Sequence, residues 1–216
     1  MKKGKTTKKN NEFKAKFDGK IFVAGTQVIE NTMTKKSMEA TIIKSPDWVQ
    51  CLAITPDMQV VFVKQYRYGT KQVTMELPGG IVDGTSGRGY ELAKYNAFRE
   101  LEEETGYRAN ESDVVWLDSI KANAAFMTNE VYGVCLKNVE RSSAVKFDEN
   151  EFCKTQHIQM KDLPLFVDFI DNPYSKLFVY GFMEMVRFNK KQPEWKPYWK
   201  ELKKGFKKLR DQLLTR

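Results

Sequence analysis

The chain of 216 residues is long enough for one catalytic-size domain with extensions, and its 41% of hydrophobic residues can form a core. No apolar run reaches membrane-spanning length, and the lysine-rich N-terminus lacks the apolar segment of a secretory signal. The single histidine, His157, excludes a histidine-based zinc site and a catalytic triad. Three cysteines without CxxC spacing favour reduced thiols and a cytoplasmic location.

Positive charge is concentrated at the two ends of the chain. Residues 1–16 carry a net charge of +6 and residues 187–216 carry +8, so the segment between them carries −6 within the total of +8. We expect residues 1–16 to be a basic, disordered tail. An acidic centre with basic ends does not indicate nucleic-acid binding, so no specific nucleic-acid partner is expected.

Runs of β-strand character fill the first half of the chain. The expected strands are residues 21–30, 37–44, 49–55, 59–65 and 73–77. The first two make an N-terminal β-region over residues 17–45. The last one enters a turn of Pro78, Gly79 and Gly80, where glycine lets the backbone approach a ligand closely and leaves carbonyl groups available.

Two side chains next to these strands are candidate binding residues. Trp48 could stack on a base, as an amphipathic ring at the edge of a site often does, or it could pack in the core. Arg67 could fork onto a phosphate or stack on adenine, or it could form a surface ion pair.

A helix is predicted over residues 91–105, followed by Gly106, which suits the left-handed conformation that ends many helices. The later predicted strands are residues 113–121, 130–138 and 152–160, and the later helices begin at residues 161–167 and span residues 174–189. A break with two prolines is expected over residues 190–197.

The C-terminal segment, residues 190–216, predicts an amphipathic helix. Its apolar residues recur at spacings of three and four, opposite a strongly basic face. They are Trp199, Leu202, Phe206, Leu209 and Leu213. We favour docking of this helix on its own domain or on a partner copy, with contact to a membrane surface or another partner as the alternative.

Three glutamates of the helix over residues 91–105 share one face. Glu100, Glu103 and Glu104 stand at positions i, i+3 and i+4, within one turn. Carboxylates that close repel one another unless a cation lies between them, and hard divalent cations such as Mg²⁺ and Mn²⁺ prefer oxygen ligands. The alternative is a solvated acidic helix face.

The pattern around these glutamates resembles the signature of the Nudix family. Glu91 stands the family's seven residues before Arg99, and the sequence from Arg99 to Tyr107 fits the signature throughout. Ten residues rather than five separate Gly80 from Glu91, and the excess reads as an inserted loop rich in Gly and Ser. Gln-Tyr-Arg before the Glu-Leu-Pro-Gly-Gly turn is similar to the branch that acts on ADP-ribose and related nucleotide sugars.

This resemblance implies a fold and a metal site. The fold is an α/β (α+β) Nudix sandwich with three layers, α/β/α, and a mixed sheet over residues 46–189, with the N-terminal β-region contributing to a homodimer. Two to three Mg²⁺ or Mn²⁺ ions are expected. The implied ligands are the Gly80 carbonyl and the carboxylates of Glu100, Glu103, Glu104 and Glu151. Arg99 is expected to hold Glu91, the first glutamate of the signature, and the loop in place, so both residues are given a positioning role.

The resemblance also implies residues for the substrate and the base. In a second acidic cluster, Glu149 is the candidate base and Glu151 the metal ligand, unless the cluster is a solvated loop. Trp48 and Arg67 are expected near the nucleotide, and Glu76 near the phosphates or metal. Residues 122–130 align with a loop that determines substrate preference in the family. There Met127 and Glu130 are candidates, although Ala124 replaces the family's proline and Glu130 replaces an arginine.

The function expected from the resemblance is metal-dependent hydrolysis of ADP-ribose to AMP and ribose 5-phosphate. One alternative is hydrolysis of another nucleotide sugar, such as GDP-mannose or ADP-glucose. Another is a non-hydrolytic module that senses ADP-ribose or RNA, but modules of that kind usually lose glutamates that this sequence keeps.

Overall fold

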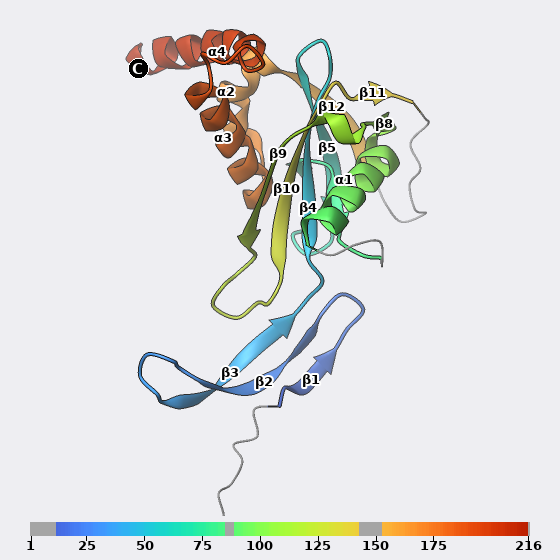
Figure 1. Cartoon of the computed structure of the whole chain (residues 1–216), viewed down its shortest axis with the longest axis vertical. Helices are drawn as coiled ribbons and strands as arrows, with labels where there is room; N and C mark the ends of the chain where they lie inside the picture. The colour runs from blue at the N-terminus through green and yellow to red at the C-terminus, as the bar shows by residue number, and fades with distance from the viewer. Residues whose placement is uncertain (1–11, 85–88, 143–152, 216) are drawn as a thin grey trace, which may run out of the picture. The chain divides into compact units, whose positions relative to one another are not determined.

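The computed structural model describes residues 12–84, 89–142 and 153–215 (Figure 1). The chain forms two compact units. The first consists of Met1–Asp47 and Ile120–Glu130, and the second of Trp48–Ser119 and Val131–Arg216. Glu149 and Glu151, the two candidates of the second acidic cluster, lie outside the described residues.

The first unit is built on an antiparallel sheet of three strands in the order β1-β2-β3. Strands β2 (Val23–Glu30) and β3 (Ser37–Lys44) confirm the two predicted runs. Strand β1 (Lys14–Asp18) was not predicted and begins inside the segment expected to be a disordered tail. Its sequence does alternate, with Ala15 and Phe17 between charged residues, but the lysine-rich composition of residues 1–16 favoured a disordered tail instead. All five residues of β1 are exposed, and the strand is defined by its pairing with β2.

The second unit contains most of a mixed sheet with the strand order β12-β5-β4-β10-β9, to which β6 and β7 add by pairing with β5 and β4. The strands are β4 (Trp48–Ile54), β5 (Gln59–Arg67), β6 (Gln72–Glu76), β7 (Gly79–Ile81), β9 (Val114–Lys121), β10 (Glu130–Lys137) and β12 (Cys153–Gln159). Strand β10 runs parallel to β4, whereas β5 runs antiparallel to it. This arrangement confirms the predicted mixed sheet.

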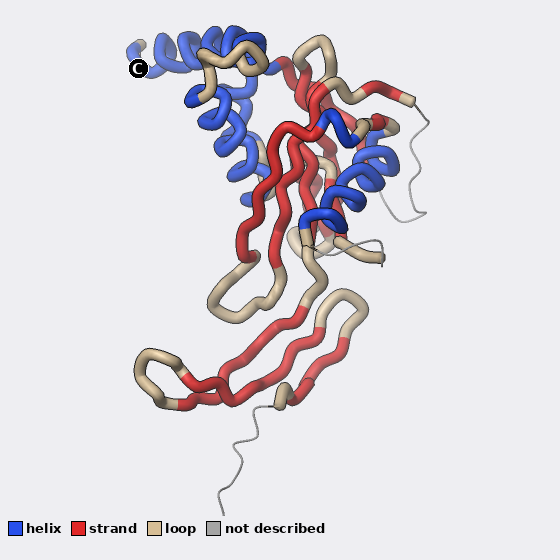
Figure 2. Tube along the Cα trace, in the orientation of Figure 1, coloured by secondary structure: helices blue, strands red, loops and turns tan. Residues whose placement is uncertain are grey.

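Helices cover both faces of this sheet (Figure 2). Residues on one face of β4, such as Val49 and Cys51, share a buried cluster with Ala97 of α1 (Tyr90–Thr105). Alternate residues point the other way. On that second face Gly133 of β10 leaves no space for a side chain, because a Cβ there would lie 2.3 Å from the Phe178 ring of α3 (Pro173–Phe188).

Helix α1 ends as the sequence predicts. Gly106 adopts φ 72°, and its N–H donates to the Glu102 carbonyl at 2.8 Å. Strand β8 (Tyr107–Arg108) follows and pairs with β11 (Glu140–Arg141), and the 3-10 helix η1 (Glu111–Asp113) leads into β9. The Tyr107 hydroxyl hydrogen-bonds His157 Nε2 at 2.8 Å, so the single histidine ties β12 to the end of α1.

The C-terminal elements pack against one another on the second unit. They are η2 (Met160–Asp162), α2 (Leu163–Phe166), η3 (Val167–Phe169), α3 and α4 (Lys196–Leu214). Helix α4 begins within the predicted break, because Pro197 lies in its first turn, where a missing N–H costs nothing. No helix of the described ranges is long and apolar enough to cross a membrane.

Docking of α4 on its own domain is confirmed for the N-terminal part of the helix. Tyr198, Leu202 and Gly205 are buried, and α4 packs on η2, α2 and α3. Gly205 marks the closest approach, since a Cβ there would lie 2.2 Å from the Lys161 carbonyl oxygen and 2.8 Å from Pro164 Cδ.

The close approach predicts that Gly205→Ala destabilises the protein. Alanine favours the helix by about 1 kcal/mol over glycine, but the clash with backbone should cost more, for a net loss of about 1–2 kcal/mol in free energy of unfolding. Urea denaturation measures this loss. Gly69→Ala is the control, because a Cβ at Gly69 meets nothing within 4 Å. A more stable Gly205→Ala variant would show that α4 does not pack at this point.

Candidate active site

A turn of two glycines forms the floor of the candidate site. Strand β7 pairs antiparallel with β4, with Gly79 opposite Gln50 and Gly80 opposite Val49. A Cβ at Gly79 would lie 2.1 Å from the Val49 carbonyl oxygen, and a Cβ at Gly80 would lie 2.4 Å from Glu100 Oε1. Glycine is therefore required at position 79, where the neighbour is backbone, whereas a side chain at position 80 would displace the Glu100 carboxylate.

The glutamates of α1 meet this turn. The Glu100 carboxylate lies directly against Gly80. The Glu104 carboxylate is buried and accepts the Gly79 N–H at 2.9 Å, and Gln65 Nε2 lies 3.5 Å from its other oxygen. Two of the expected glutamate ligands are thus brought to the backbone that was expected to supply a carbonyl ligand.

Arg99 connects the carboxylates of Glu100 and Glu103 to the glycine turn. Its guanidinium donates to Glu100 Oε1 at 2.7 Å and to Glu103 Oε2 at 2.8 Å. It also reaches the Ile81 carbonyl at 3.4 Å and Asp83 at 3.5 Å, so it contacts the loop that leaves the glycine turn. Arg99 thus joins two glutamates of α1 to the loop.

Burial alone would lower the pKa of Arg99. The charges of Glu100 and Glu103 outweigh that effect and, together with Asp83, raise the pKa above its ordinary value. Arg99 therefore stays cationic, and its charge balances the carboxylates that surround it.

The expected contact between Arg99 and Glu91 is absent from the described structure, which is a correction. Glu91 instead pairs with Lys94 at 2.9 Å. The loop is held by Asn96, a fully buried residue whose Nδ2 donates to the Asp83 carbonyl at 2.9 Å. Asn96 Oδ1 also accepts from Arg99 at 2.9 Å. The start of the inserted loop is thus fixed to α1 at Asp83, before residues 85–88, which lie outside the described ranges.

Arg67 and Glu76, both expected to face the substrate, pair with each other. Arg67 donates from Nε and Nη2 to the two oxygens of Glu76, both at 2.7 Å. Glu76 is only 2% exposed, and it also accepts from Thr74 at 2.5 Å and from Asn172 at 2.6 Å. The buried carboxylate is therefore fully engaged in holding Arg67 and the strand before the glycine turn.

These contacts decide the charge of the pair. Burial alone would raise the pKa of Glu76, but the hydrogen bonds from Arg67 and Thr74 and the charge of Arg67 hold it below its ordinary value of 4.5. The hydrogen bond from Asn172 adds to this effect. In turn the pKa of Arg67 is raised, mainly by its hydrogen bond to Glu76 and against its own burial.

Residues at the start of α3 complete the support, and the sequence interpretation missed them. Asn172 caps the helix by accepting from Tyr174 and Ser175 N–H groups, and donates to Glu76. The Ser175 hydroxyl accepts from Leu77 N–H at 3.0 Å and contacts Gln50. Asn followed by Pro173 is a helix-start signal that could have marked the cap, but no sequence signal shows that this cap holds Glu76.

The remaining candidates lie as follows. Trp48, the first residue of β4, is half-buried, and its ring packs edge-on against Tyr174 with centroids 6.0 Å apart. Met127 and Glu130 belong to the first compact unit, where Met127 bridges to Ile43 of β3 and Glu130 pairs with Lys121.

The donor set at the turn has the chemistry that a hard divalent cation requires. It consists of carboxylate oxygens and backbone carbonyls. Within residues 12–84, 89–142 and 153–215 no three acidic, histidine or cysteine side chains form a ready-made ligand cluster. Here Glu100 and Glu103 turn to Arg99, and Glu104 turns to the Gly79 amide. The residues therefore fit a hard cation in chemical type, and their carboxylates would have to turn from these partners to bind it.

The depressed pKa of Glu76 predicts a pH-dependent contribution to stability. Glu76→Gln should lower the free energy of unfolding by about 2 kcal/mol at neutral pH, because a buried charge-assisted hydrogen-bond set is weakened. Since the folded pKa lies below 4.5, the difference from the wild type is present above that pH and shrinks as the pH falls through the folded value. Urea denaturation at several pH values measures it.

The exposed Glu39 on β3 supplies the control. Glu39→Gln should leave the free energy of unfolding within about 0.5 kcal/mol of the wild type. A Glu76→Gln difference that is constant between neutral and acid pH would contradict the assigned charge of Glu76.

Comparison with known proteins agrees with this geometry. The NUDIX domain model matches residues 46–178. Over 150 residues the chain is 30% identical to the ADP-ribose pyrophosphatase of Bacillus subtilis (strain 168), covering 68% of this chain and 75% of that protein. Over 112 residues it is 32% identical to the methanol dehydrogenase activator of Bacillus methanolicus, covering 51% and 57%.

A solved structure shares the fold. The crystal structure of an ADP compounds hydrolase matches with a TM-score of 0.65 over 82% of this chain and 93% of that chain, at 19% identity. The family model covers more than half of the chain, and the site holds the glutamates of the family signature around its glycine turn. The chain therefore belongs to the Nudix family, as a pyrophosphohydrolase whose relatives include an ADP-ribose pyrophosphatase.

Proposed function

We propose that the chain hydrolyses the pyrophosphate bond of a nucleoside diphosphate sugar, and that its substrate is ADP-ribose, cleaved to AMP and ribose 5-phosphate. The observation that carries the proposal is the meeting of Glu100 and Glu104 with the Gly79–Gly80 backbone. The name of the Bacillus subtilis relative, ADP-ribose pyrophosphatase, supports the choice of substrate.

Metal binding is part of the proposal. Glu100, Glu103, Glu104 and the Gly80 carbonyl would hold Mg²⁺ or Mn²⁺, two to three ions in all, with Glu151 as a further ligand. Such ions neutralise phosphate charge and lower the pKa of a bound water. Nudix hydrolases generally use divalent metals, and the carboxylate oxygens at the turn suit hard cations.

The chain's own residues would position the reacting groups. Glu104, fixed by the Gly79 amide, and Glu100, fixed against Gly80, cannot swing away from the turn without breaking these contacts. Arg99 holds Glu103 and the loop. Water would attack one phosphorus, the anhydride P–O bond would break towards the other phosphate, and Glu149 would take the proton of the water.

Arg67 and Trp48 would contact the nucleotide. Arg67 uses only Nε and Nη2 on Glu76 and is 43% exposed, so it retains other N–H donors and a planar face for a phosphate or for adenine. Trp48 offers an amphipathic ring that is half-buried on Tyr174. Glu76 would hold Arg67 in place, whereas Met127 and Glu130 would contribute to substrate choice.

The proposal also includes a homodimer in a cytoplasmic location. Exposed apolar side chains on the first unit, among them Phe17 and Met38, offer a surface for a second copy, and light scattering of the purified chain measures its mass in solution. The buried free cysteines Cys51, Cys135 and Cys153 suit a reducing compartment, and fractionation of the source cells tests the location.

The activity test uses Glu103→Gln. This side chain is 44% exposed and its pairing partner is Arg99, so the variant should fold while the rate of AMP release from ADP-ribose with Mg²⁺ falls by more than about 100-fold. EDTA should abolish the wild-type rate. Glu39→Gln is the matched control and should keep the rate. A Glu103→Gln rate near that of the wild type would contradict the metal assignment.

A panel with GDP-mannose and ADP-glucose separates the alternatives. If the nucleoside monophosphate is released faster from one of these nucleotide sugars than from ADP-ribose, that nucleotide sugar is the substrate, and the proposed reaction still holds. If no nucleoside monophosphate is released from any of the three compounds while ADP-ribose binds tightly, the chain is better explained as a sensing module than as an enzyme.

A further inference from the structure

The outer face of α4 carries a continuous stripe of cations. Its members follow one another at steps of four, three, four and three residues. They are Lys196, Lys200, Lys203, Lys207 and Arg210, and all are exposed. At about 100° per residue the five side chains fall within roughly 80° of the helix circumference. This cationic stripe lies opposite Tyr198, Leu202 and Gly205, the face buried on the domain.

Most of the positive charge of the stripe is not neutralised by acidic side chains of α4. The two acids of α4 lie outside it: Glu201 pairs with Lys204 at 2.7 Å, and Asp211 pairs with Arg210 at 2.8 Å. Throughout α4, all of which is described, the other four members of the stripe have no ion pair. At 1.5 Å per residue the stripe is about 21 Å long.

The helix extends past its docking surface and ends in two exposed leucines. Leu213 is 62% exposed and Leu214 is 79% exposed. Leu214 follows Arg210 by four residues, so it continues the line of the stripe. An exposed apolar side chain in line with cationic residues can enter the headgroup region of a bilayer that these residues bind.

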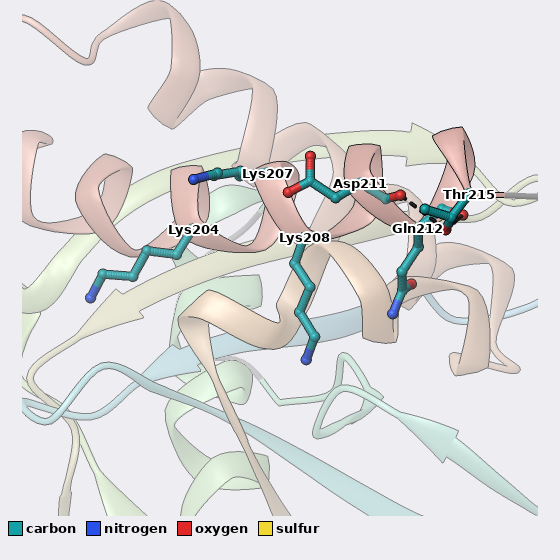
Figure 3. A pocket seen from close by; sticks show the side chains of 6 residues that line it. All are labelled: Lys204, Lys207, Lys208, Asp211, Gln212 and Thr215. Carbon is teal, nitrogen blue, oxygen red and sulfur yellow. Dashed lines mark hydrogen bonds between the residues drawn. The ribbon is translucent and has the colours of Figure 1, made fainter.

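Two depressions along this face are lined by α4 alone. One of about 480 Å³ lies on the stripe and is lined by Lys200, Lys203, Lys204, Phe206, Lys207 and Arg210. Another of about 370 Å³ lies beside the stripe, where Figure 3 shows Lys204, Lys207 and Lys208 spreading from the helix. Because no second element supplies a wall, this surface suits an extended partner better than a small molecule.

Nucleic acid fits this face less well than an anionic lipid surface does. Binding of single strands uses exposed aromatic rings for base stacking. On α4 the rings of Trp199 and Phe206 are half-buried, with centroids 6.2 Å apart, and Tyr198 is buried. The stripe is mostly lysine, a point charge, whereas arginine forks onto individual phosphates.

We propose that α4 binds the surface of an anionic lipid bilayer through the cationic stripe, with Leu214 at its end entering the headgroup region. The proposal goes beyond hydrolysis and is independent of it, because no stripe residue belongs to the glycine turn or to α1. The interaction is reversible and electrostatic, since a helix docked on its domain cannot bury its apolar face in lipid.

The test is co-sedimentation of the full chain with vesicles of phosphatidylcholine, with and without phosphatidylglycerol. The wild type should bind only the anionic vesicles, and high salt should release it. The triple variant Lys200→Gln, Lys203→Gln, Lys207→Gln should bind about 100-fold more weakly, at roughly fivefold per cation. Its thermal melting should match the wild type, because the three side chains are exposed.

The N-terminal lysines provide a matched control. The variant Lys2→Gln, Lys3→Gln, Lys5→Gln removes the same charge and should keep most of the vesicle binding. The proposal is overturned if the wild type fails to bind anionic vesicles, or if the tail variant loses binding while the helix variant keeps it. It is also overturned if single-stranded RNA binds through the stripe more tightly than the vesicles do.

Discussion

The rest of the site depends on the close contact between the Gly79–Gly80 turn and helix α1. Gly79 lies against the Val49 carbonyl and Gly80 against the Glu100 carboxylate, so a Cβ at either position would collide. The same contact lets the Gly79 amide hold buried Glu104. Because the sheet and the helix share one buried cluster, the distance between turn and glutamates is set by core packing rather than by a flexible loop.

A second set of contacts fixes the strand that enters this turn. Glu76 binds Arg67, Thr74 and Asn172 at once, and Ser175 receives the Leu77 amide. The start of α3 therefore supports the turn from the opposite side of the sheet to α1. In physical terms, a buried carboxylate is tolerable only with such a full set of partners.

The features that depend on neighbouring residues in the sequence were predicted correctly. The predicted bounds of the helix over residues 91–105 agree with α1 to within one residue, and Gly106 ends the helix as expected. Both features depend on local sequence: the spacing of apolar residues and a glycine that can adopt the left-handed conformation. The glutamates of the Nudix signature were recognised for the same reason, since they stand close together in the sequence. Strand β1 was not predicted, because the lysine-rich composition of residues 1–16 favours disorder and hides a local hairpin with β2. The contact of Asn172 with Glu76 was not predicted, because this hydrogen bond joins residues 96 positions apart. For Arg67 and Glu76 the substrate role stays a prediction, and the structure pairs the two side chains with each other.

The most direct test of the account is binding of Mn²⁺, followed by electron paramagnetic resonance of the free ion. The account predicts that the wild type binds Mn²⁺ and that Glu104→Gln and Gly80→Ala each weaken binding by about tenfold or more. One removes a charge from the carboxylate group, and the other displaces Glu100. Glu39→Gln should bind like the wild type. Unchanged Mn²⁺ binding in both turn variants would contradict a cation site at the glycine turn.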